Sequence, residues 1–473
     1  MAIKTFQLTA LASLVAALLV GCSSLPTFVP DMLRRPSSAS VPLRLQGARG
    51  VLTAAQSKAV LDGLRSRSPA TDIFERHLAI ESALTGSPLT TGNEVVLLED
   101  GPATYRAMLA AIGAARDHIN METYILDDDK VGQQFAQALI DKQRQGVQVN
   151  LIRDSAGTFS TPVAFFQRLV DSGIQVLEFN PVNPLTAGKD WQWNRRDHRK
   201  LLIVDGLTAF LGGINISSVY SGGSFRKGVR VQPDPRTAGA PGTVDAWRDT
   251  DLQLRGPVVA ELQKLFVGTW QAQSGMALDD KRYFPPTSAV GRQVVRAIGS
   301  SPEEPYSQIY ATLLSAIANA ETSVHITNAY FVPDPQLLAA LEAAAARGVD
   351  VVLILPGRTD SWLVFHAGRT HYERLLRAGV KLYERRDAIL HSKTALIDGV
   401  WATVGSTNLD WRSFLHNQEV NAVVLGAEFG AQVQAMFERD LSASDAILLE
   451  QWQQRSLLLR LKENFARLWE YWL

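Results

Sequence analysis

Residues 195–206 read RRDHRKLLIVDG, and residues 388–399 read AILHSKTALIDG. Each stretch places a histidine two residues before a lysine, followed by aliphatic residues and an Asp-Gly pair. In an extended chain, residues two apart project from the same side, so each histidine is predicted to stand beside its lysine. The aliphatic run after each lysine is typical of a buried strand. The chain therefore carries one polar cassette twice, each time joined to a strand.

The surroundings of the two cassettes repeat as well. Residues 105–154 predict a helix, a strand, a second helix and a second strand, and residues 309–357 predict the same order. Each half continues with a helix that ends in glycine and a short strand, LVDSGIQVLEF and LLRAGVKLYER. Alternating strands and helices predict an α/β fold, built by an internal duplication of about 200 residues.

The cassette has a chemistry suited to phosphorus. An imidazole supplies a nucleophile or a proton near neutral pH, and an ammonium neutralises charge on phosphate oxygens. Each aspartate lies an odd number of residues from its histidine, so we expect it to act structurally or through hydrogen bonds rather than on a substrate. The predicted catalytic set is His198, Lys200, Asp205, His391, Lys393 and Asp398.

A turn of small residues follows each cassette. The first copy has Gly212-Gly213-Ile214-Asn215 and the second has Gly405-Ser406-Thr407-Asn408, which completes the pattern H-x-K-x₄-D-x₆-G-[GS]-x-N in both halves. Small residues let the backbone approach a phosphate, and an amide side chain can donate to its oxygens. The predicted phosphate-binding or orienting residues therefore include Asn215, Ser406 and Asn408.

This paired motif resembles that of the phospholipase D superfamily. The resemblance implies two lobes, each a mixed β-sheet flanked by helices, related by a pseudo-twofold axis and sharing one active site. It also implies that one histidine attacks phosphorus to form a phosphohistidine, while the other protonates the leaving alcohol. By position, His198 is the expected nucleophile and His391 the acid/base, although the near symmetry leaves that order open. Acidic residues further along orient the imidazoles in this family, and Asp251 and Glu419 are the matching candidates.

Several stretches resemble the bacterial cardiolipin synthase branch, among them INMETYILDDD, YFVPD, ILPGRTDS and VGSTNLDWRSFLHNQEVN. The resemblance implies transfer of a phosphatidyl group to phosphatidylglycerol, with phosphatidylglycerol or phosphatidylethanolamine as donor and with no cofactor or metal. The alternatives are a hydrolase that releases phosphatidate, a nuclease, and a non-catalytic lipid-binding lipoprotein. Lys+Arg and Asp+Glu are equal at 47 each, which disfavours a nucleic-acid partner.

The N-terminus predicts secretion and lipid anchoring. A basic residue, Lys4, precedes an apolar run that ends at Gly21-Cys22, and the run is too short to cross a bilayer. The stretch LVGC resembles a bacterial lipobox, which implies cleavage after residue 21 and acylation of Cys22, the only cysteine. The alternative is an ordinary signal peptide or a short anchor. We expect a protein of the bacterial cell envelope, facing the periplasm, and Ser23 favours the outer membrane over the inner.

The remaining segments follow from composition. Residues 22–50 are rich in Ser, Pro and Arg and predict a tether. The two lobes are expected at 51–290 and 291–450. An insertion at 221–245 is either a lid or acceptor gate near the site, or a surface loop. Residues 451–473 predict an amphipathic C-terminal helix, either at a membrane interface or docked on the body. The oligomeric state is left open.

Overall fold

The computed structural model describes residues 43–69, 71–183, 192, 194–222, 247–273, 278 and 281–473. The predicted signal peptide, Cys22 and most of the tether lie outside these residues. So does the predicted lid or gate, apart from its first two residues.

The first lobe is a mixed sheet with the strand order β3, β11, β9, β8, β4, β5, β6. Pairing is antiparallel from β3 to β4 and parallel from β4 to β6. The strands span Leu89–Glu99 (β3), Thr250–Arg255 (β11), Thr208–Gly212 (β9), Leu201–Val204 (β8), His118–Thr123 (β4), Gln148–Asp154 (β5) and Gln175–Phe179 (β6).

The second lobe repeats this order strand for strand, as β12, β21, β19, β18, β13, β15, β16, and adds β22 at its edge. These strands span Gln293–Ser300 (β12), Asn417–Leu425 (β21), Trp401–Gly405 (β19), Lys393–Ile397 (β18), Ser323–Asn328 (β13), Asp350–Pro356 (β15), Lys381–Arg385 (β16) and Ser444–Ile447 (β22). The predicted duplication and the α/β fold are confirmed.

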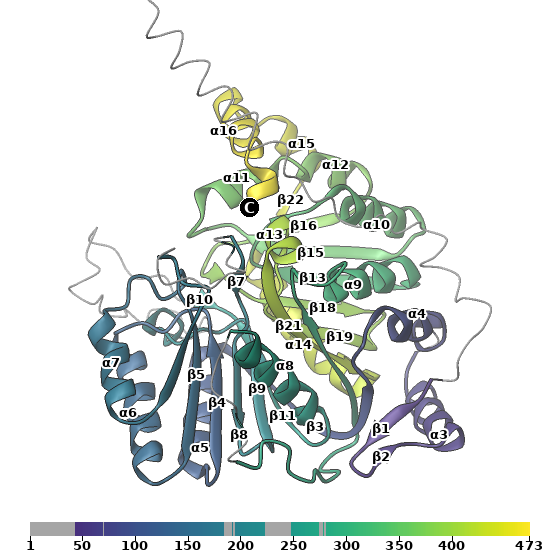
Figure 1. Cartoon of the computed structure of the whole chain (residues 1–473). Helices are drawn as coiled ribbons and strands as arrows, with labels where there is room; N and C mark the ends of the chain where they lie inside the picture. Colours follow the sequence, from purple (N-terminus) through teal and green to yellow (C-terminus); the bar gives the residue numbers. More distant parts are fainter. Residues whose placement is uncertain are drawn as a thin grey trace, which may run out of the picture.

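The two lobes meet along their first strands. β3 and β12 pair antiparallel, with Thr90 opposite Val295, so the two sheets form one continuous surface (Figure 1). The apolar residues of β8 and β18 are buried, as their sequence predicts. Because the first strand of each lobe is a shared edge, neither sheet is complete without the other.

Helices cover both sheets, and the equivalent helices α6 (Lys130–Arg144) and α10 (Pro335–Ala346) begin in the same way. Asp129 caps α6 by accepting from the amides of Val131 and Gly132, and Asp334 caps α10 in the same manner. α6 buries Val131, Phe135 and Leu139, which recur at helical spacing. The equivalent pairs are α5 (Asp100–Ala114) and α9 (Gln308–Asn319), α6 (Lys130–Arg144) and α10 (Pro335–Ala346), α7 (Val163–Asp171) and α12 (Tyr372–Arg377), and α8 (Val258–Ala272) and α14 (Ala427–Ser442).

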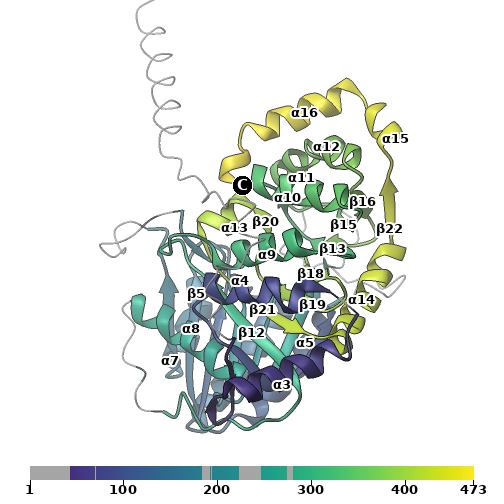
Figure 2. The same ribbon diagram turned by 90° about the vertical axis from the view of Figure 1, so that its right-hand side faces the viewer.

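The segment before β3 belongs with the second lobe, although the sequence assigned residues from 51 onward to the first. Leu45, Leu61 and Phe74 share one core with residues of α9 and β13. Leu45 is fully buried, so the predicted tether ends before it. The segment contains β1 (Leu45–Gly47), β2 (Gly50–Val51), α3 (Ala54–Arg65), η1 (Asp72–Phe74) and α4 (Arg76–Leu84), and α4 lies beside α9 (Figure 2).

The C-terminal segment lies outermost on the second lobe, above α11 and α12 (Figure 2). It contains α15 (Leu449–Gln453), α16 (Leu457–Arg467) and η3 (Glu470–Trp472), and α11 spans Trp362–Arg369. Ala466 of α16 packs against Ala367 of α11, as the docked alternative expects. Within the described residues, no helix combines the length and the apolar character needed to cross a membrane.

Candidate active site

Each histidine is delivered by a chain segment that pairs with the other half. β7 (Arg196–Asp197) runs parallel to the start of β21, and the amide of His198 donates to the Gln418 carbonyl over 3.0 Å. β10 (Trp247–Arg248) runs parallel to β17 (Ile389–Leu390), and the amide of His391 donates to the Arg248 carbonyl over 2.7 Å. The two cassettes therefore reach one site by crossing the junction between the lobes.

His198 is held by a carboxylate of the second half. Its Nδ1 lies 3.0 Å and 3.1 Å from the two carboxylate oxygens of Glu419, which the sequence had assigned to this task. Ser406 Oγ and Asn417 Nδ2 also donate to Glu419, so the carboxylate is fixed from three sides. His198 is 7% exposed and Glu419 is fully buried. With Nδ1 committed to Glu419, Nε2 is the ring nitrogen left for a substrate.

His391 is held by Asp249 and not by Asp251, which the sequence had assigned. Nδ1 of His391 lies 2.6 Å from Asp249 Oδ2. Asp251 Oδ1 instead accepts from the amide of Ile214 over 3.1 Å, which fixes the turn after β9. His391 is 4% exposed, and Asp249 comes from the first half. Each imidazole thus depends on a carboxylate of the opposite lobe.

The strand registers explain this correction. Asp251 lies opposite Gly212, and Asn421 lies opposite Gly405, which is the equivalent glycine of the second half. Asp251 is therefore the counterpart of Asn421, whose side chain accepts from the amide of Thr407. Counting back two residues from each makes Asp249 the counterpart of Glu419. Aligning residues 248–251 (RDTD) with residues 418–421 (QEVN) identifies Asp249 as the counterpart of Glu419. The long insertion before Asp249 makes its distance from Asn215 differ from that between Asn408 and Glu419, so the spacing alone does not reveal it.

The glycines of the small-residue turn make room for these carboxylates rather than for a phosphate. A Cβ on Gly213 would lie 2.2 Å from Asp249 Oδ1, so no side chain fits there. In the second half Ser406 takes that place, and its hydroxyl donates to Glu419. Of the two roles open to Ser406, phosphate binding or orientation, this hydrogen bond to Glu419 is of the orienting kind.

The two asparagines of the motif differ. Asn215 Oδ1 accepts from the amide of Ile125, and its Nδ2 donates to the hydroxyl of Tyr220 over 3.0 Å, so its amide is committed to the protein instead of a phosphate. Asn408 is buried, and its Oδ1 has no hydrogen-bond partner within the described residues. Of the two side chains, Asn408 is the one whose Oδ1 can still form a hydrogen bond with a ligand.

The lysines stand beside their histidines as the spacing predicts. Lys200 Nζ donates to the backbone carbonyl of His198, and Lys393 Nζ donates to that of His391. Lys393 Nζ also lies 3.0 Å from Nδ1 of His391. All four side chains are buried, so the two ammonium groups lie in an environment where their charge acts strongly on an anion.

Asp205 and Asp398 lie at the far end of their strands, away from the histidines, and have the structural role expected of them. Each begins an Asp-Gly turn with positive φ, 54° at Asp205 and 51° at Asp398. Three residues separate the last paired residues of each hairpin, 205–207 in the first lobe and 398–400 in the second. Asp205 accepts from the amides of residues 116–118, and Asp398 accepts from those of residues 321–323. They fix the hairpin to the start of the neighbouring strand.

Aromatic side chains that the motif does not include surround the imidazoles. The ring of Tyr124 lies 5.1 Å from that of His198, and the ring of its counterpart Tyr330 lies 6.0 Å from that of His391. Trp247 and Tyr220 also contact His391, and the Tyr220 hydroxyl lies 3.3 Å from its Nδ1. The repeat Tyr124/Tyr330 was visible in the sequence, whereas nothing in the sequence marked Tyr220 or Trp247.

Burial lowers the pKa values of the two histidines and the two lysines of the site. It lowers the pKa of His198 to about 4, with Glu419 opposing and Lys200 adding to the effect. It also lowers the pKa of Lys200 to about 7 and that of Lys393 to about 8. The pKa of His391 is lowered by burial and by Lys393, while Asp249 opposes. Within the described residues, no cluster of three or more His, Cys, Asp or Glu side chains could hold a metal ion.

Asp249→Asn and Asp251→Asn distinguish the orienting residue from its neighbour. Asp249→Asn removes the charge that supports His391, so we expect kcat for phosphodiester exchange to fall on the order of 10²-fold or more. Asp251→Asn should be nearly silent, because burial and Asp249 already raise the pKa of Asp251 well above its usual range and the second lobe has asparagine at this place. Steady-state kinetics on both folded variants would measure this. Equal losses, or a larger loss for Asp251→Asn, would contradict the assignment.

The comparisons with known proteins agree with this geometry. A family model described as "Cardiolipin synthase, PLD-like domain" matches residues 108–221 and 313–441, which contain one cassette each. The cardiolipin synthase of Geobacillus kaustophilus is 34% identical over 384 residues, which is 80% of this chain and 72% of that protein. Cardiolipin synthase A of Pseudomonas entomophila is 34% identical over 80% of this chain and 75% of its own length.

Among solved structures, a phosphatidylserine synthase of Haemophilus influenzae has the same fold, with a TM-score of 0.60. It is 14% identical, and the match covers 84% of this chain and all of that one. With the paired cassettes in one site, these similarities show that the chain belongs to the cardiolipin synthase branch of the phospholipase D superfamily and is a phospholipase D-type phosphatidyltransferase.

Proposed function

We propose that this enzyme joins two phosphatidylglycerol molecules into cardiolipin and releases glycerol, with phosphatidylethanolamine as an alternative donor. The observation that carries this proposal is the pair of imidazoles, each held through Nδ1 by a carboxylate of the opposite half. The chain is also 34% identical to cardiolipin synthases over about four fifths of its length.

In the first step, Nε2 of His198 attacks the donor phosphorus. The bond between phosphorus and the headgroup oxygen breaks, and His391 gives its Nε2 proton to that oxygen. Glu419 stabilises the positive charge that develops on His198. Lys200 and Lys393 neutralise the non-bridging oxygens.

In the second step, the glycerol hydroxyl of the acceptor loses its proton to His391 and attacks phosphorus. The bond between phosphorus and His198 breaks, and the imidazole leaves neutral. Both imidazoles return to their starting protonation states. One phosphodiester replaces another, so the exchange needs no external source of energy.

Electrostatics supports the order of the two roles. Lys200 and Lys393 both lower the pKa of His198, which favours the neutral imidazole that a nucleophile requires. Burial and Lys393 also lower the pKa of His391, but two carboxylates, Asp249 and Asp360, oppose that shift. At His198 a single carboxylate, Glu419, opposes it. His198 is therefore the proposed nucleophile and His391 the proposed acid/base.

Burial of the imidazoles supports transfer over hydrolysis. Both hydrolase and transferase form the same intermediate, and they differ in whether water or an alcohol reaches it. His198 and His391 are 7% and 4% exposed and lie among tyrosine and tryptophan rings. A site of this kind limits bulk water, so a positioned hydroxyl is favoured as acceptor.

Product analysis tests the proposal. The purified enzyme, given labelled phosphatidylglycerol in mixed micelles with EDTA present, should form cardiolipin and glycerol in equal amounts, with phosphatidate as a minor product. His198→Ala and His391→Ala serve as controls and should form neither product, because both imidazoles act in every turnover. Phosphatidate as the main product would make the enzyme a hydrolase. Loss of activity on adding EDTA would contradict a mechanism that uses side chains alone.

The pH dependence follows from the lysines. As pH rises through about 7 to 8, Lys200 and Lys393 lose the charge that neutralises phosphate, so kcat/KM should fall on the alkaline side. A bound phosphodiester anion favours the protonated lysines, so the alkaline limb of kcat should lie at higher pH than that of kcat/KM. Initial rates against pH would measure both limbs. A kcat/KM that stays flat to about pH 9 would show that neither ammonium is needed.

We also infer that the enzyme is lipid-anchored through Cys22 and faces the periplasm, with Ser23 favouring the outer membrane. The support is the LVGC stretch at the end of the short apolar run. Cells fed labelled fatty acid should label the wild-type protein but not Cys22→Ala, which should accumulate unprocessed or leave the membrane. A Cys22→Ala protein that is labelled and processed normally would contradict the inference.

A further inference from the structure

α16 is docked with its polar side inward. Glu463 and Ala466 are buried against the second lobe, whereas Leu457, Leu461 and Leu468 are 77%, 66% and 77% exposed. A surface helix of a globular protein normally buries its apolar face and exposes its charges. Leu458 and Phe465 of the helix and Trp469 just beyond its end are exposed as well. We call these six residues the α16 face.

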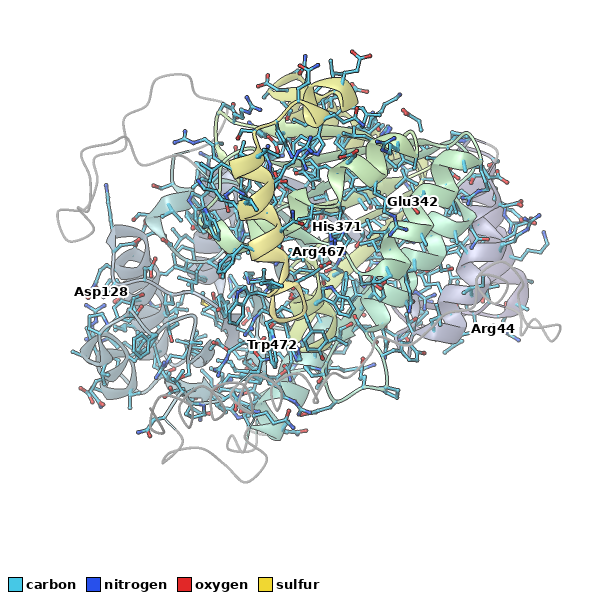
Figure 3. The ribbon with its side chains drawn as sticks, turned by 90° about the horizontal axis from the view of Figure 1, so that it is seen from above. Arg44, Asp128, Glu342, His371, Arg467 and Trp472 are labelled. Carbon is cyan, nitrogen blue, oxygen red and sulfur yellow. The ribbon has the colours of Figure 1, made fainter. Side chains whose placement is uncertain are left out.

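Ion pairs fix this orientation. Glu463 Oε2 lies 3.0 Å from Arg455 Nη2, and Glu463 Oε1 lies 3.9 Å from Arg369 Nε on α11. Beyond the end of the helix, Glu470 Oε1 lies 2.8 Å from His371 Nε2. Turning the leucines inward would take Glu463 away from Arg455 and Arg369, and a buried carboxylate without its cationic partners is costly. The apolar face is therefore held outward. Figure 3 shows α16 on the side of the molecule that faces the viewer, with Arg467 labelled on it and His371 nearby.

Apart from Asn464, the exposed or half-buried polar residues of α16 are cationic. Arg460, Lys462 and Arg467 flank the α16 face, and the one acidic residue of α16 is the buried Glu463. An apolar face bordered by cations fits the interface of an anionic phospholipid bilayer. A second copy of this chain fits poorly, since a symmetric pair would place the same three cations against one another.

The α16 face is also connected to the active site. Beyond η3, the carbonyl of Leu473 accepts from the amide of Arg412, and the ring of Tyr471 lies 6.1 Å from that of His416. The carbonyl of His416 in turn accepts from the amide of Arg196, two residues before His198. On the other side, α16 packs on α11, which follows Asp360, the partner of Tyr330 beside His391. A surface bound to α16 would lie next to the walls of the site.

We propose that the α16 face inserts into the interface of an anionic phospholipid bilayer and holds the active site against the membrane surface. This role does not depend on which product the enzyme forms. It supplies a second membrane contact, close to the chemistry, beside any anchor at the N-terminus.

A fluorescent probe tests the contact directly. The full chain carrying Cys22→Ser and Leu461→Cys is labelled with an environment-sensitive dye and mixed with vesicles of phosphatidylglycerol and phosphatidylcholine. We expect a blue shift of the dye and quenching by brominated acyl chains. Leu207→Cys is the matched control, because Leu207 is 48% exposed but lies in the turn after β8, away from the histidines. An unshifted dye at 461, or one already shifted without vesicles, would overturn the proposal.

An activity comparison separates this proposal from the proposed reaction. Leu461→Glu/Phe465→Glu should lower turnover of vesicle substrate by about tenfold or more and leave turnover of monomeric short-chain phosphatidylglycerol unchanged. Leu207→Glu should change neither. Equal losses on both substrates would overturn the proposal. Parent enzyme that forms no cardiolipin from either substrate would instead count against the reaction, and the dye result would stand.

Discussion

Two carboxylate–imidazole contacts across the lobe junction determine the rest of this structure. Glu419 of the second half holds His198, and Asp249 of the first half holds His391. All four side chains are buried. Shifting one lobe relative to the other would leave buried carboxylates without their imidazole partners, at a cost of about 1–3 kcal/mol or more for each lost hydrogen bond. The pairing of β3 with β12, and of each cassette with a strand of the other half, keeps the lobes in the register that these contacts require.

Each imidazole is held by a carboxylate of the opposite lobe, which explains why the two halves form one shared site and not two independent ones. A single lobe has an imidazole and a lysine, but the carboxylate that fixes its imidazole belongs to the other lobe. Neither half can therefore orient a nucleophile alone. In the proposed mechanism, the duplication supplies two imidazoles to one phosphorus atom, because one must bond to phosphorus while the other moves a proton.

The sequence predicted the features that repeat and missed those that depend on register or on long-range packing. The succession of helices and strands along each half, the paired cassettes and Glu419 all follow from motifs present in both halves. Asp251 was chosen in place of Asp249 because the insertion before it removes the spacing that identifies Glu419. Residues 51–84 were assigned to the first lobe because they precede it in the chain. Yet Leu61 and Phe74 belong to the core of the second lobe, and no local pattern records that long-range packing.

The supports of the two carboxylates also differ, and the difference fits the proposed roles. Glu419 accepts from Ser406 and Asn417 as well as from His198, which spreads its charge over three donors. Asp249, beside Gly213, has only the amide of Thr250 on its other oxygen within the described residues. A carboxylate with fewer donors stabilises an adjacent imidazolium more strongly. The difference comes from one position of the duplicated fold, which is Ser406 in the second lobe and Gly213 in the first. It favours a neutral imidazole at His198 and a more readily protonated one at His391.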